Sequence, residues 1–361
     1  MNNTVILIPS HLRATRLPNK PLLLINNKPM IVHCWQRAID SKIGEVYVAT
    51  ADEEIAKVIK DVGGKSILTS KEHKTGSDRI FEAIEKNFSK KPSNIINLQG
   101  DMPNIDPSAI KLLDKFMNNT VILIPSHLRA TRLPNKPLLL INNKPMIVHC
   151  WQRAIDSKIG EVYVATADEE IAKVIKDVGG KSILTSKEHK TGSDRIFEAI
   201  EKNFSKKPNN IINLQGDMPN IDPSAIKLLD KFMNNNSYQI ATLATELNSI
   251  KDLENKNIVK IETKKEMQIN NFDNALDFFR LKNINKDNFY YHHVGIYGYQ
   301  YETLKKFISL KRSDNEINRS LEQMRAMDND ISISVGLTDS YPLGVDTIED
   351  LEEIRNIMKN G

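Results

Sequence analysis

Several features that define familiar protein classes are scarce or missing in this sequence. Cysteine occurs twice in 361 residues, too rarely for a disulfide scaffold, and aromatic residues make up only 6%. No apolar run approaches the roughly 20 residues of a membrane-spanning helix, and no charged segment precedes an apolar core at the start of the chain. The net charge is only +4, and the lysines are scattered. We expect no secretory signal and no binding to membranes or nucleic acid.

The two cysteines, Cys34 and Cys150, lie in the same local sequence, Val-His-Cys-Trp-Gln, within an expected helix. They are predicted to be buried free thiols in a reducing compartment rather than a disulfide pair. The composition, with 40% hydrophobic and 27% charged residues, is that of an ordinary globular protein. A cytoplasmic enzyme is therefore the default prediction.

A long internal repeat dominates the chain. Residues 1–116 and 117–232 are identical except that Ser93 corresponds to Asn209, and residues 233–361 occur once. Solenoid repeats have periods of about 20–50 residues, so this much longer period indicates a duplicated half-domain rather than a repeat array.

Only one partner segment exists for two copies of the half-domain. The second copy connects directly to residues 233–361, which lowers its loop-closure cost, and we predict that 117–361 forms the working fold. The apolar faces of 1–116 need a partner layer. We expect this extra copy to be a partly exposed half-domain, or one that borrows a partner by swapping in an oligomer.

Strand and helix patterns alternate in the second copy. Buried strands are expected at 120–124, 161–165, 182–185 and 210–214. Helices are expected at 146–155, after an N-cap at Asp168, after an N-cap at Ser193, and from Asp222-Pro223 onward. This alternation predicts an α/β fold in which helices cover both faces of a parallel sheet.

The unique segment has a different pattern. Strands are expected at 239–243, 258–261, 290–299 and 331–335, and helices at 302–310 and 320–327. Residues 262–288, rich in Asn and Lys, are expected to form a polar excursion. Thr347 and Asp350 have the spacing of an N-terminal cap pair for a closing helix.

A basic loop follows the first strand of the second copy. Arg129, Arg132 and Lys136 fall within eight residues, and Pro134 and Pro137 stiffen the exit of the loop. An α/β sheet binds anions at the carboxyl ends of its strands, and three cations suit a polyphosphate better than a carboxylate. A solvated charged loop is the alternative for this segment taken alone.

Two aspartates are candidate metal ligands. Asp217, in Gln-Gly-Asp, follows the strand 210–214 opposite the basic loop, and Asp346 lies in Gly-Val-Asp-Thr. Carboxylates together with phosphates suit Mg²⁺, which keeps several waters. Taken singly, Asp217 could cap the next helix and Asp346 could flank a cap. Combined with the basic loop, the two predict a metal–polyphosphate site.

Other familiar signatures are missing or ambiguous. The sequence has no dinucleotide glycine motif after its first strand, no Walker motif, no zinc-type cysteine and histidine spacing, and no nucleophile elbow. His292 and His293 lie on an expected strand with Tyr297, where they could contact a sugar or serve as structural groups.

Several motifs, taken in order, resemble those of the 3-deoxy-manno-octulosonate (Kdo) cytidylyltransferases, or CMP-Kdo synthetases. The resemblance covers nearly all of 117–361. It rests on the loop 124–138, Lys144-Pro-Met-Ile147, Val164-Ala-Thr-Ala-Asp168, His189-Lys-Thr-Gly-Ser-Asp-Arg195, Gln215-Gly-Asp217, Asn257-Ile-Val-Lys260, His293-Val-Gly-Ile-Tyr-Gly-Tyr299, Leu321-Glu-Gln-Met-Arg325 and Gly344-Val-Asp-Thr347.

The resemblance implies a fold, an activity and partners. The fold would be a mainly parallel Rossmann-like nucleotidyltransferase sheet with helices on both faces, together with a smaller mixed sugar-binding and dimerisation subdomain. Residues 117–232 would be the nucleotide-binding half and 233–361 the half that binds the sugar and completes the metal site, with 1–116 an extra nucleotide-binding half. The enzyme would be a cytoplasmic homodimer that uses CTP, Kdo and Mg²⁺ to make CMP-Kdo and pyrophosphate for lipopolysaccharide biosynthesis.

The family's functional residues carry over onto matching positions. The catalytic set would be Arg132, Lys136, Asp217 and Asp346, of which the two aspartates would bind Mg²⁺. The nucleotide-binding set would be Arg129, Arg132, Lys136, Thr191, Ser193, Arg195 and Gln215. The Kdo pocket would be lined by Gln215, Arg280, His293, Tyr297, Glu322 and Gln323, with Arg280 on the sugar carboxylate.

Three departures from the family pattern bear on this assignment. His127 stands where the family usually has an arginine, and Asn135 stands where it usually has a glycine. After Arg280, a shorter Leu-Lys-Asn-Ile-Asn-Lys segment replaces an Ile-Pro sequence and a second arginine. Two alternatives stay open: activation of another, sialate-like ulosonic acid, and a non-catalytic nucleotide-binding protein.

The extra copy repeats part of this set. It holds the nucleotide-loop residues as Arg16, Lys20, Arg79, Gln99 and Asp101 but has no counterpart of the residues after position 232. We therefore predict one competent site per chain.

Overall fold

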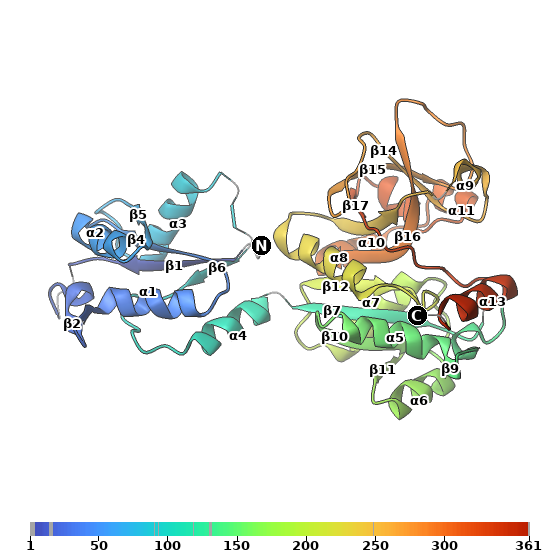
Figure 1. Ribbon diagram of the computed structural model, residues 1–361, viewed down its shortest axis with the longest axis horizontal. Helices are drawn as coiled ribbons and strands as arrows, with labels where there is room; N and C mark the ends of the chain where they lie inside the picture. Colours follow the sequence, from blue (N-terminus) through green and yellow to red (C-terminus); the bar gives the residue numbers. More distant parts are fainter. Residues whose placement is uncertain are drawn as a thin grey trace. The chain divides into compact units, whose positions relative to one another are not determined.

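The computed structural model divides into two compact units. The described residues are 4–13, 17–89, 91–92, 94–117, 119–129, 132–247 and 249–359. The first unit comprises Met1–Asn118 with Asn234–Asn236, and the second comprises Asn119–Met233 with Ser237–Gly361. The main boundary falls where the second copy of the repeat begins (Figure 1).

The first unit is a half-domain built on a four-stranded parallel sheet of order β5-β4-β1-β6. Its elements are β1 (Thr4–Ser10), η1 (Lys20–Leu22), β2 (Leu24–Ile25), β3 (Lys28–Pro29), α1 (Met30–Asp40), β4 (Glu45–Thr50), α2 (Glu53–Asp61), β5 (Lys65–Leu68), α3 (Gly76–Asn87), β6 (Asn94–Asn97) and α4 (Pro107–Met117). Strand β6 lies at the edge of this sheet.

The second unit begins with the same elements. They are β7 (Thr120–Ser126), η2 (Lys136–Leu138), β8 (Leu140–Ile141), β9 (Lys144–Pro145), α5 (Met146–Asp156), β10 (Glu161–Thr166), α6 (Glu169–Asp177), β11 (Lys181–Leu184), α7 (Gly192–Asn203), β12 (Asn210–Leu214) and α8 (Pro223–Asn235). Strands β11, β10, β7 and β12 form the parallel part of the sheet.

The unique segment extends this sheet. It contributes β13 (Ile240–Thr245), α9 (Ile250–Glu254), β14 (Lys260–Thr263), β15 (Phe272–Phe279), β16 (Phe289–Gln300), α10 (Tyr301–Ser309), α11 (Asp314–Arg319), α12 (Met324–Met327), β17 (Ile333–Leu337) and α13 (Ile348–Ile357). The result is a nine-stranded sheet of order β11-β10-β7-β12-β16-β13-β17-β15-β14. The predicted α/β class, with a mainly parallel sheet followed by a mixed second part, is confirmed.

Helices cover both faces of the parallel strands because side chains alternate along each strand. On β7, Val121 and Leu123 join the hydrophobic cluster under α7 and α10, whereas Ile122 and Ile124 join the cluster under α5, α6 and α8. The strands are therefore apolar on both faces, as the unbroken apolar run 120–124 indicates.

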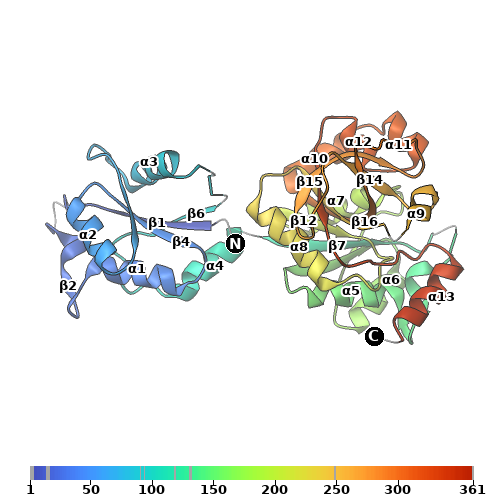
Figure 2. The ribbon, with the colours of Figure 1, turned by 45° about the horizontal axis from the view of Figure 1, so that its top comes forward.

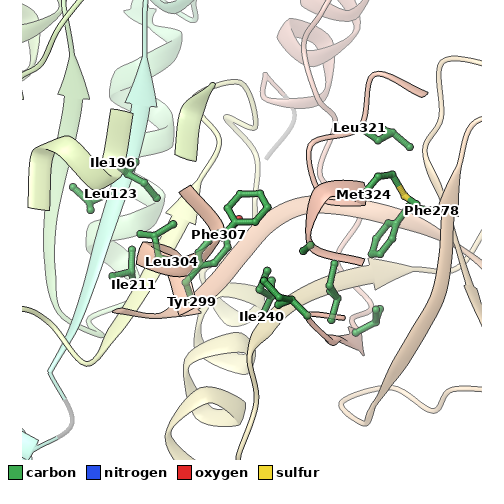
Figure 3. Close-up of a cluster of buried hydrophobic side chains, with 14 of the residues drawn as sticks. Leu123, Ile196, Ile211, Ile240, Phe278, Tyr299, Leu304, Phe307, Leu321 and Met324 are labelled. Carbon is green, nitrogen blue, oxygen red and sulfur yellow. The ribbon is translucent and has the colours of Figure 1, made fainter. Parts of the chain in front are cut away.

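Strand β16 joins the two halves of the second unit. It pairs antiparallel with β12, with Ile211 opposite Tyr299 and Asn213 opposite Tyr297. Figure 3 shows Ile211 close to Leu304 of α10, in the same buried cluster. The unique segment thereby covers the edge of the sheet that β12 presents.

Helix α13 packs against the second copy of the repeat. It lies beside the green part of the chain in Figures 1 and 2. Arg355 Nε donates to the carbonyl of Leu140 at 2.9 Å, and Asn142 Nδ2 donates to the carbonyl of Met358 at 2.8 Å. The predicted Thr347–Asp350 capping pair is confirmed, because each side chain accepts the other residue's backbone N–H. This docking carries Asp346 back toward the basic loop.

Several local predictions need correction. The polar excursion 262–288 contains strand β15, because Phe272, Phe278 and Phe279 supply apolar contacts that the overall polarity of the segment hides. Instead of one helix at 320–327, two short helices, α11 and α12, flank a left-handed Ser320. This backbone conformation interrupts the helix.

Two predicted helix caps differ from the structure. The cap of α7 is Thr191, which accepts the N–H of Asp194 at 3.2 Å, whereas Ser193 lies inside the first turn and is buried. Asp168 occupies the N-cap position of α6 without capping it, because its carboxylate accepts the N–H of Leu128 at 2.9 Å. The contact of Asp168 is long-range and cannot be read from local spacing, whereas the α7 cap differs from the prediction by only two positions.

Both cysteines are buried free thiols, as predicted. Within the described ranges, none of the helices combines the length and apolar character needed to cross a membrane.

Candidate active site

The basic loop runs from the carboxyl end of β7 to η2. Leu128 N–H is fixed by Asp168, and Arg129 Nη1 donates to the carbonyl of Lys187 at 3.3 Å, so two neighbouring loops position the start of the segment. Asn135 takes a left-handed conformation, with φ 56°, just before Lys136. Asparagine tolerates that conformation better than most residues, so it can replace the glycine usual in the family.

Lys136 joins the two predicted metal-binding aspartates. Its Nζ donates to Asp217 Oδ2 at 2.9 Å, to Asp346 Oδ1 at 3.1 Å and to the carbonyl of Val345 at 2.9 Å. Arg132 Nη2 reaches the other oxygen of Asp346 at 3.2 Å. The structure thus brings together four residues that are separated by up to 214 positions.

The charges of this cluster reinforce one another. Burial by itself lowers the pKa of Lys136, but Asp217 and Asp346 outweigh burial and hold that pKa above its ordinary value. Burial likewise raises the pKa of Asp346, yet Lys136 and Arg132 outweigh it and bring that pKa below the ordinary value. Both groups are therefore charged at neutral pH.

These residues border a pocket of about 330 Å³, a size suited to a small organic ligand. Its lining residues are Pro125, Ser126, His127, Arg129, Arg132, Leu133, Lys136, Pro137, His189, Lys190, Thr191, Gly192, Arg195, Gln215, Gly216, Asp217 and Asp346. Cations outnumber carboxylates among them, so the pocket favours a polyanion.

The far wall of the pocket is built around Arg195. This side chain is 3% exposed, and its Nη1 donates to Thr185 Oγ1 at 2.6 Å and to the carbonyl of Ser186 at 3.2 Å. Burial lowers its pKa, although Asp168 and Glu198 act in the opposite direction. Arg195 is thus held rigidly, with donors remaining beyond those two bonds.

Two glycines let the backbone come close to the pocket. A Cβ at Gly216 would lie 3.2 Å from the carbonyl oxygen of Pro125, and a Cβ at Gly192 would lie 3.1 Å from Pro125 Cγ. A larger residue at either position would push the loops apart, so these glycines set the width of the pocket.

The residues predicted for the sugar lie beyond the lining of this pocket, except for Gln215. Gln215 Cγ lies 3.6 Å from the Cβ position of Gly295, on the strand that also carries His293 and Tyr297. The rings of His293 and Tyr297 are 5.3 Å apart, and His293 Nε2 contacts Thr242 Oγ1 at 3.1 Å. Gln215 therefore lies between the cationic pocket and this aromatic surface.

Among the described residues, several buried polar atoms of the pocket lining and of the predicted site residues have no hydrogen-bond partner at normal geometry. They are Ser126 Oγ, Ser193 Oγ, Glu322 Oε1 and Gln323 Nε2. Burial raises the pKa of Glu322. Unsatisfied buried donors and acceptors are costly, and they are expected where a polar ligand completes the bonding.

Arg280 is placed differently from the other predicted sugar residues. Its Nη1 donates to the carbonyls of Asn257 at 3.0 Å and Lys256 at 3.3 Å, and it does not line the pocket. Its charge still contributes to lowering the pKa of Asp346. The guanidinium lies within electrostatic reach of the aspartate pair.

Several polar lining residues had no predicted role. Ser126, His189 and Lys190 lie within the motifs of the family resemblance, and His127 stands at a departure from the family pattern. Their position near Arg132 and Lys136 could have been predicted from the sequence, because all of them lie at or after the carboxyl ends of parallel strands. The contact from Lys136 to the carbonyl of Val345 had no local signal.

The aspartate pair fits a divalent cation by its chemistry. Asp217 Oδ2 and Asp346 Oδ1 already converge on one cationic atom, Lys136 Nζ, and carboxylate oxygens are the protein ligands that Mg²⁺ takes. In the described part of the chain, no three His, Cys, Asp or Glu side chains gather as a metal site.

The fold and the site define a class of protein. A parallel sheet whose strand ends hold a cationic pocket, closed by two aspartates from distant segments, is the architecture of an α/β nucleotidyltransferase. A cytidylyltransferase family profile matches residues 5–120 and 121–333, and the chain belongs to this family.

Known proteins agree with this assignment. The 3-deoxy-manno-octulosonate cytidylyltransferase of Thermodesulfovibrio yellowstonii is 43% identical over 243 residues, which are 64% of this chain and 95% of that protein. The protein of the same name from Bartonella tribocorum is 41% identical, over 66% of this chain and 98% of that protein. A solved structure of CMP:2-keto-3-deoxy-manno-octonic acid synthetase with CTP matches with a TM-score of 0.59 and 35% identity, over 67% of this chain and 99% of that one.

Proposed function

We propose that this chain transfers the cytidylyl group of CTP to Kdo, giving CMP-Kdo and pyrophosphate for lipopolysaccharide biosynthesis. One observation carries the proposal: Lys136 ties Asp217 and Asp346 together at the mouth of the cationic pocket. The named relatives and the CTP-bound neighbour support both substrates.

The site residues divide the work by position. Arg129, Arg132 and Lys136 neutralise the triphosphate, while Thr191 and Arg195 seat the cytidine against the glycine wall. The 2-hydroxyl of the sugar attacks the α-phosphorus, and pyrophosphate leaves toward the basic loop. Phosphoryl transfer of this kind depends mostly on alignment and charge neutralisation.

The sugar is proposed to bind on the surface of β16. His293 and Tyr297 would form its floor, and Glu322 and Gln323 would offer their unpartnered polar atoms to its hydroxyls. Ser193 Oγ and Gln215 would bridge the two substrates. Arg280 would have to turn from its backbone carbonyls to reach the sugar carboxylate.

Mg²⁺ is proposed as the cofactor, held by Asp217 and Asp346. When bound, it would neutralise phosphate charge and lower the pKa of the attacking hydroxyl. The protein would work in the cytoplasm as a homodimer, with 117–361 as the catalytic domain and 1–116 as an additional nucleotide-binding half. Limited proteolysis tests this division, because a stable core that begins well before residue 117 would contradict it.

The direct test is pyrophosphate release from CTP, Kdo and magnesium by the full chain. Asp217→Asn and Asp346→Asn are each expected to slow release on the order of a hundredfold, because each removes a charge from the convergence point. Glu349→Gln is the matched control, since Glu349 is an exposed carboxylate in the first turn of α13 outside the pocket lining. Unchanged rates in both aspartate variants would show that the aspartates have no catalytic role.

The identity of the sugar needs a separate comparison. The same assay with a nine-carbon ulosonic acid should give a much lower kcat/KM than with Kdo. A higher value would assign the enzyme to that acid instead. Binding of CTP without pyrophosphate release from any ulosonic acid would favour a non-catalytic nucleotide-binding protein.

A further inference from the structure

The nucleotide pocket draws nearly all of its lining from the repeated segment. Apart from Asp346, every lining residue belongs to 117–232, and each has an identical counterpart in 1–116. The residues proposed to bind the sugar follow a different rule, because most of them lie in 233–361. Each copy of the repeat therefore contains nearly all of the pocket residues proposed to bind the nucleotide, but few of the residues proposed to bind the sugar.

The first unit reproduces the local geometry of that pocket. Lys20 Nζ pairs with Asp101 Oδ2 at 2.9 Å, as Lys136 pairs with Asp217. Arg79 is 3% exposed and donates to the carbonyl of Ser70 at 3.2 Å, as Arg195 does to Ser186.

The loops around these cations are also the same. Leu12 N–H is held by Asp52 at 2.9 Å, and Arg13 Nη1 reaches the carbonyl of Lys71 at 3.5 Å. A Cβ at Gly100 would lie 3.0 Å from the carbonyl oxygen of Pro9. This wall of the pocket is therefore formed in the first unit without a partner segment. Arg16, the counterpart of Arg132, lies outside the described residues.

The triphosphate end differs between the two copies. Lys136 is 15% exposed, and its three bonds satisfy all of its N–H donors. Lys20 is 34% exposed and, within the described residues, pairs only with Asp101, so two of its donors remain for a phosphate. The first unit has no counterpart of Asp346, and its Lys20 is therefore more exposed to solvent than Lys136 is.

We propose that residues 1–116 form a second, non-catalytic site for a nucleoside triphosphate, the same CTP that the catalytic unit uses. This inference rests on the proposed function for the choice of nucleotide. With no sugar-binding residues and no counterpart of Asp346, the site holds CTP without transferring it. Its dissociation constant for CTP with magnesium is expected to be about tenfold higher than that of the catalytic site, because the proposed magnesium ligand Asp346 has no counterpart there.

The test is the stoichiometry of CTP binding to the full chain by isothermal titration with magnesium and no sugar. The unmodified chain should bind two CTP molecules, and Arg79→Ala and Arg195→Ala should each bind one. Lys20→Gln and Lys136→Gln repeat the comparison with side chains outside the core, in case the buried arginines are needed for folding. In each variant the other copy serves as an internal control.

The possible outcomes separate the two proposals. One CTP per chain, lost in Arg195→Ala and Lys136→Gln but kept in Arg79→Ala and Lys20→Gln, would overturn the second site and leave the proposed function intact. No CTP binding at all would contradict both. Two molecules per chain that both persist in every variant would show that neither pocket binds the nucleotide.

Discussion

Identical side chains have different surroundings in the two copies of the repeat. Leu113 is 45% exposed, whereas its counterpart Leu229 is fully buried, and Ile95 is 40% exposed whereas Ile211 is fully buried. Within each pair the local sequence is the same, apart from Ser93 against Asn209 near the isoleucines, so the difference in exposure reflects mainly the cover that 233–361 provides. Burial of such a side chain contributes about 1.5–3 kcal/mol.

These pairs predict unequal effects of the same substitution. Leu229→Ala should lower the free energy of unfolding of the second unit by about 2–5 kcal/mol, because it leaves a cavity. Leu113→Ala should lower the free energy of unfolding of the first unit by much less, since water already reaches the side chain. The two tryptophans, Trp35 and Trp151, lie one in each unit, so urea unfolding followed by fluorescence in Trp35→Phe or Trp151→Phe chains reports each unit separately. Equal losses would contradict the difference in burial.

The adjacent histidines on β16 make the second unit sensitive to acid. Burial lowers the pKa of His293 to about 3 and that of His292 to about 4, against 6.5 for an exposed histidine. Below pH 6.5 these histidines bind protons in the unfolded chain but stay neutral in the folded chain. The free energy of unfolding therefore falls as the pH falls. Each histidine should cost about 2 kcal/mol at about pH 5.

Replacing one histidine should remove its share of this loss. His293→Asn, measured by urea unfolding with Trp151 as the reporter in a Trp35→Phe chain, should lose less stability than the parent between about pH 7 and pH 5. The comparison is made between slopes, so a fixed cost of the substitution cancels. Parallel curves for the two chains would mean that His293 titrates normally in the folded state.

At the scale of elements, sequence patterns were most informative where one local rule decides the structure. The apolar run 120–124 is buried on both faces, and the Thr347–Asp350 spacing forms a capping box. The patterns failed where distant contacts decide. Strand β15 forms by pairing with β14 and β17. Asp168 does not cap α6, because its carboxylate accepts the backbone N–H of Leu128.

The candidate site shows the same division. The basic loop and the Gln-Gly-Asp turn could be placed at the strand ends from sequence, because parallel strands fix where their carboxyl ends lie. The distance of Asp346 from Lys136 could not, since it depends on α13 docking onto β8. Likewise, no periodicity reveals that Arg280 turns to the carbonyls of Lys256 and Asn257.

Strands β6 and β12 have the same sequence, but β6 lies at the edge of its sheet and β12 lies between β7 and β16. Peptides spanning 94–113 and 210–229 have equal mass, so hydrogen exchange should give two isotope envelopes for one peptide. The fast envelope should come from β6, whose outer edge has no strand alongside it within the described residues, and the slow one from β12, which pairs with β16. Ile95→Val shifts the mass of the first copy and assigns the envelopes. A single envelope would mean that both strands are equally covered.

At the scale of the whole molecule, the chain contains two half-domains and one segment able to complete a half-domain. The second unit gains a continuous core on both sides of its sheet, and α13 closes the site from the far end of the sequence. The first unit keeps its own smaller core, but it leaves Met102 and Leu113 more than 40% exposed. The free energy of unfolding of the first unit is therefore expected to be lower than that of the second.

The two cysteines allow that difference to be measured in the intact chain. Cys34 and Cys150 are both fully buried, and burial raises the pKa of each thiol, to about 11 for Cys34, so neither reacts until its unit opens. Pulsed labelling with a maleimide across a urea series should modify Cys34, in a Cys150→Ala chain, at lower urea than Cys150 in a Cys34→Ala chain. The two substitutions are the same change in the same local sequence, so their own cost to each unit is matched. Labelling of both thiols at one urea concentration would show that the units open together, which is expected only if 1–116 finds a partner surface equal to the one that 233–361 gives to 117–232.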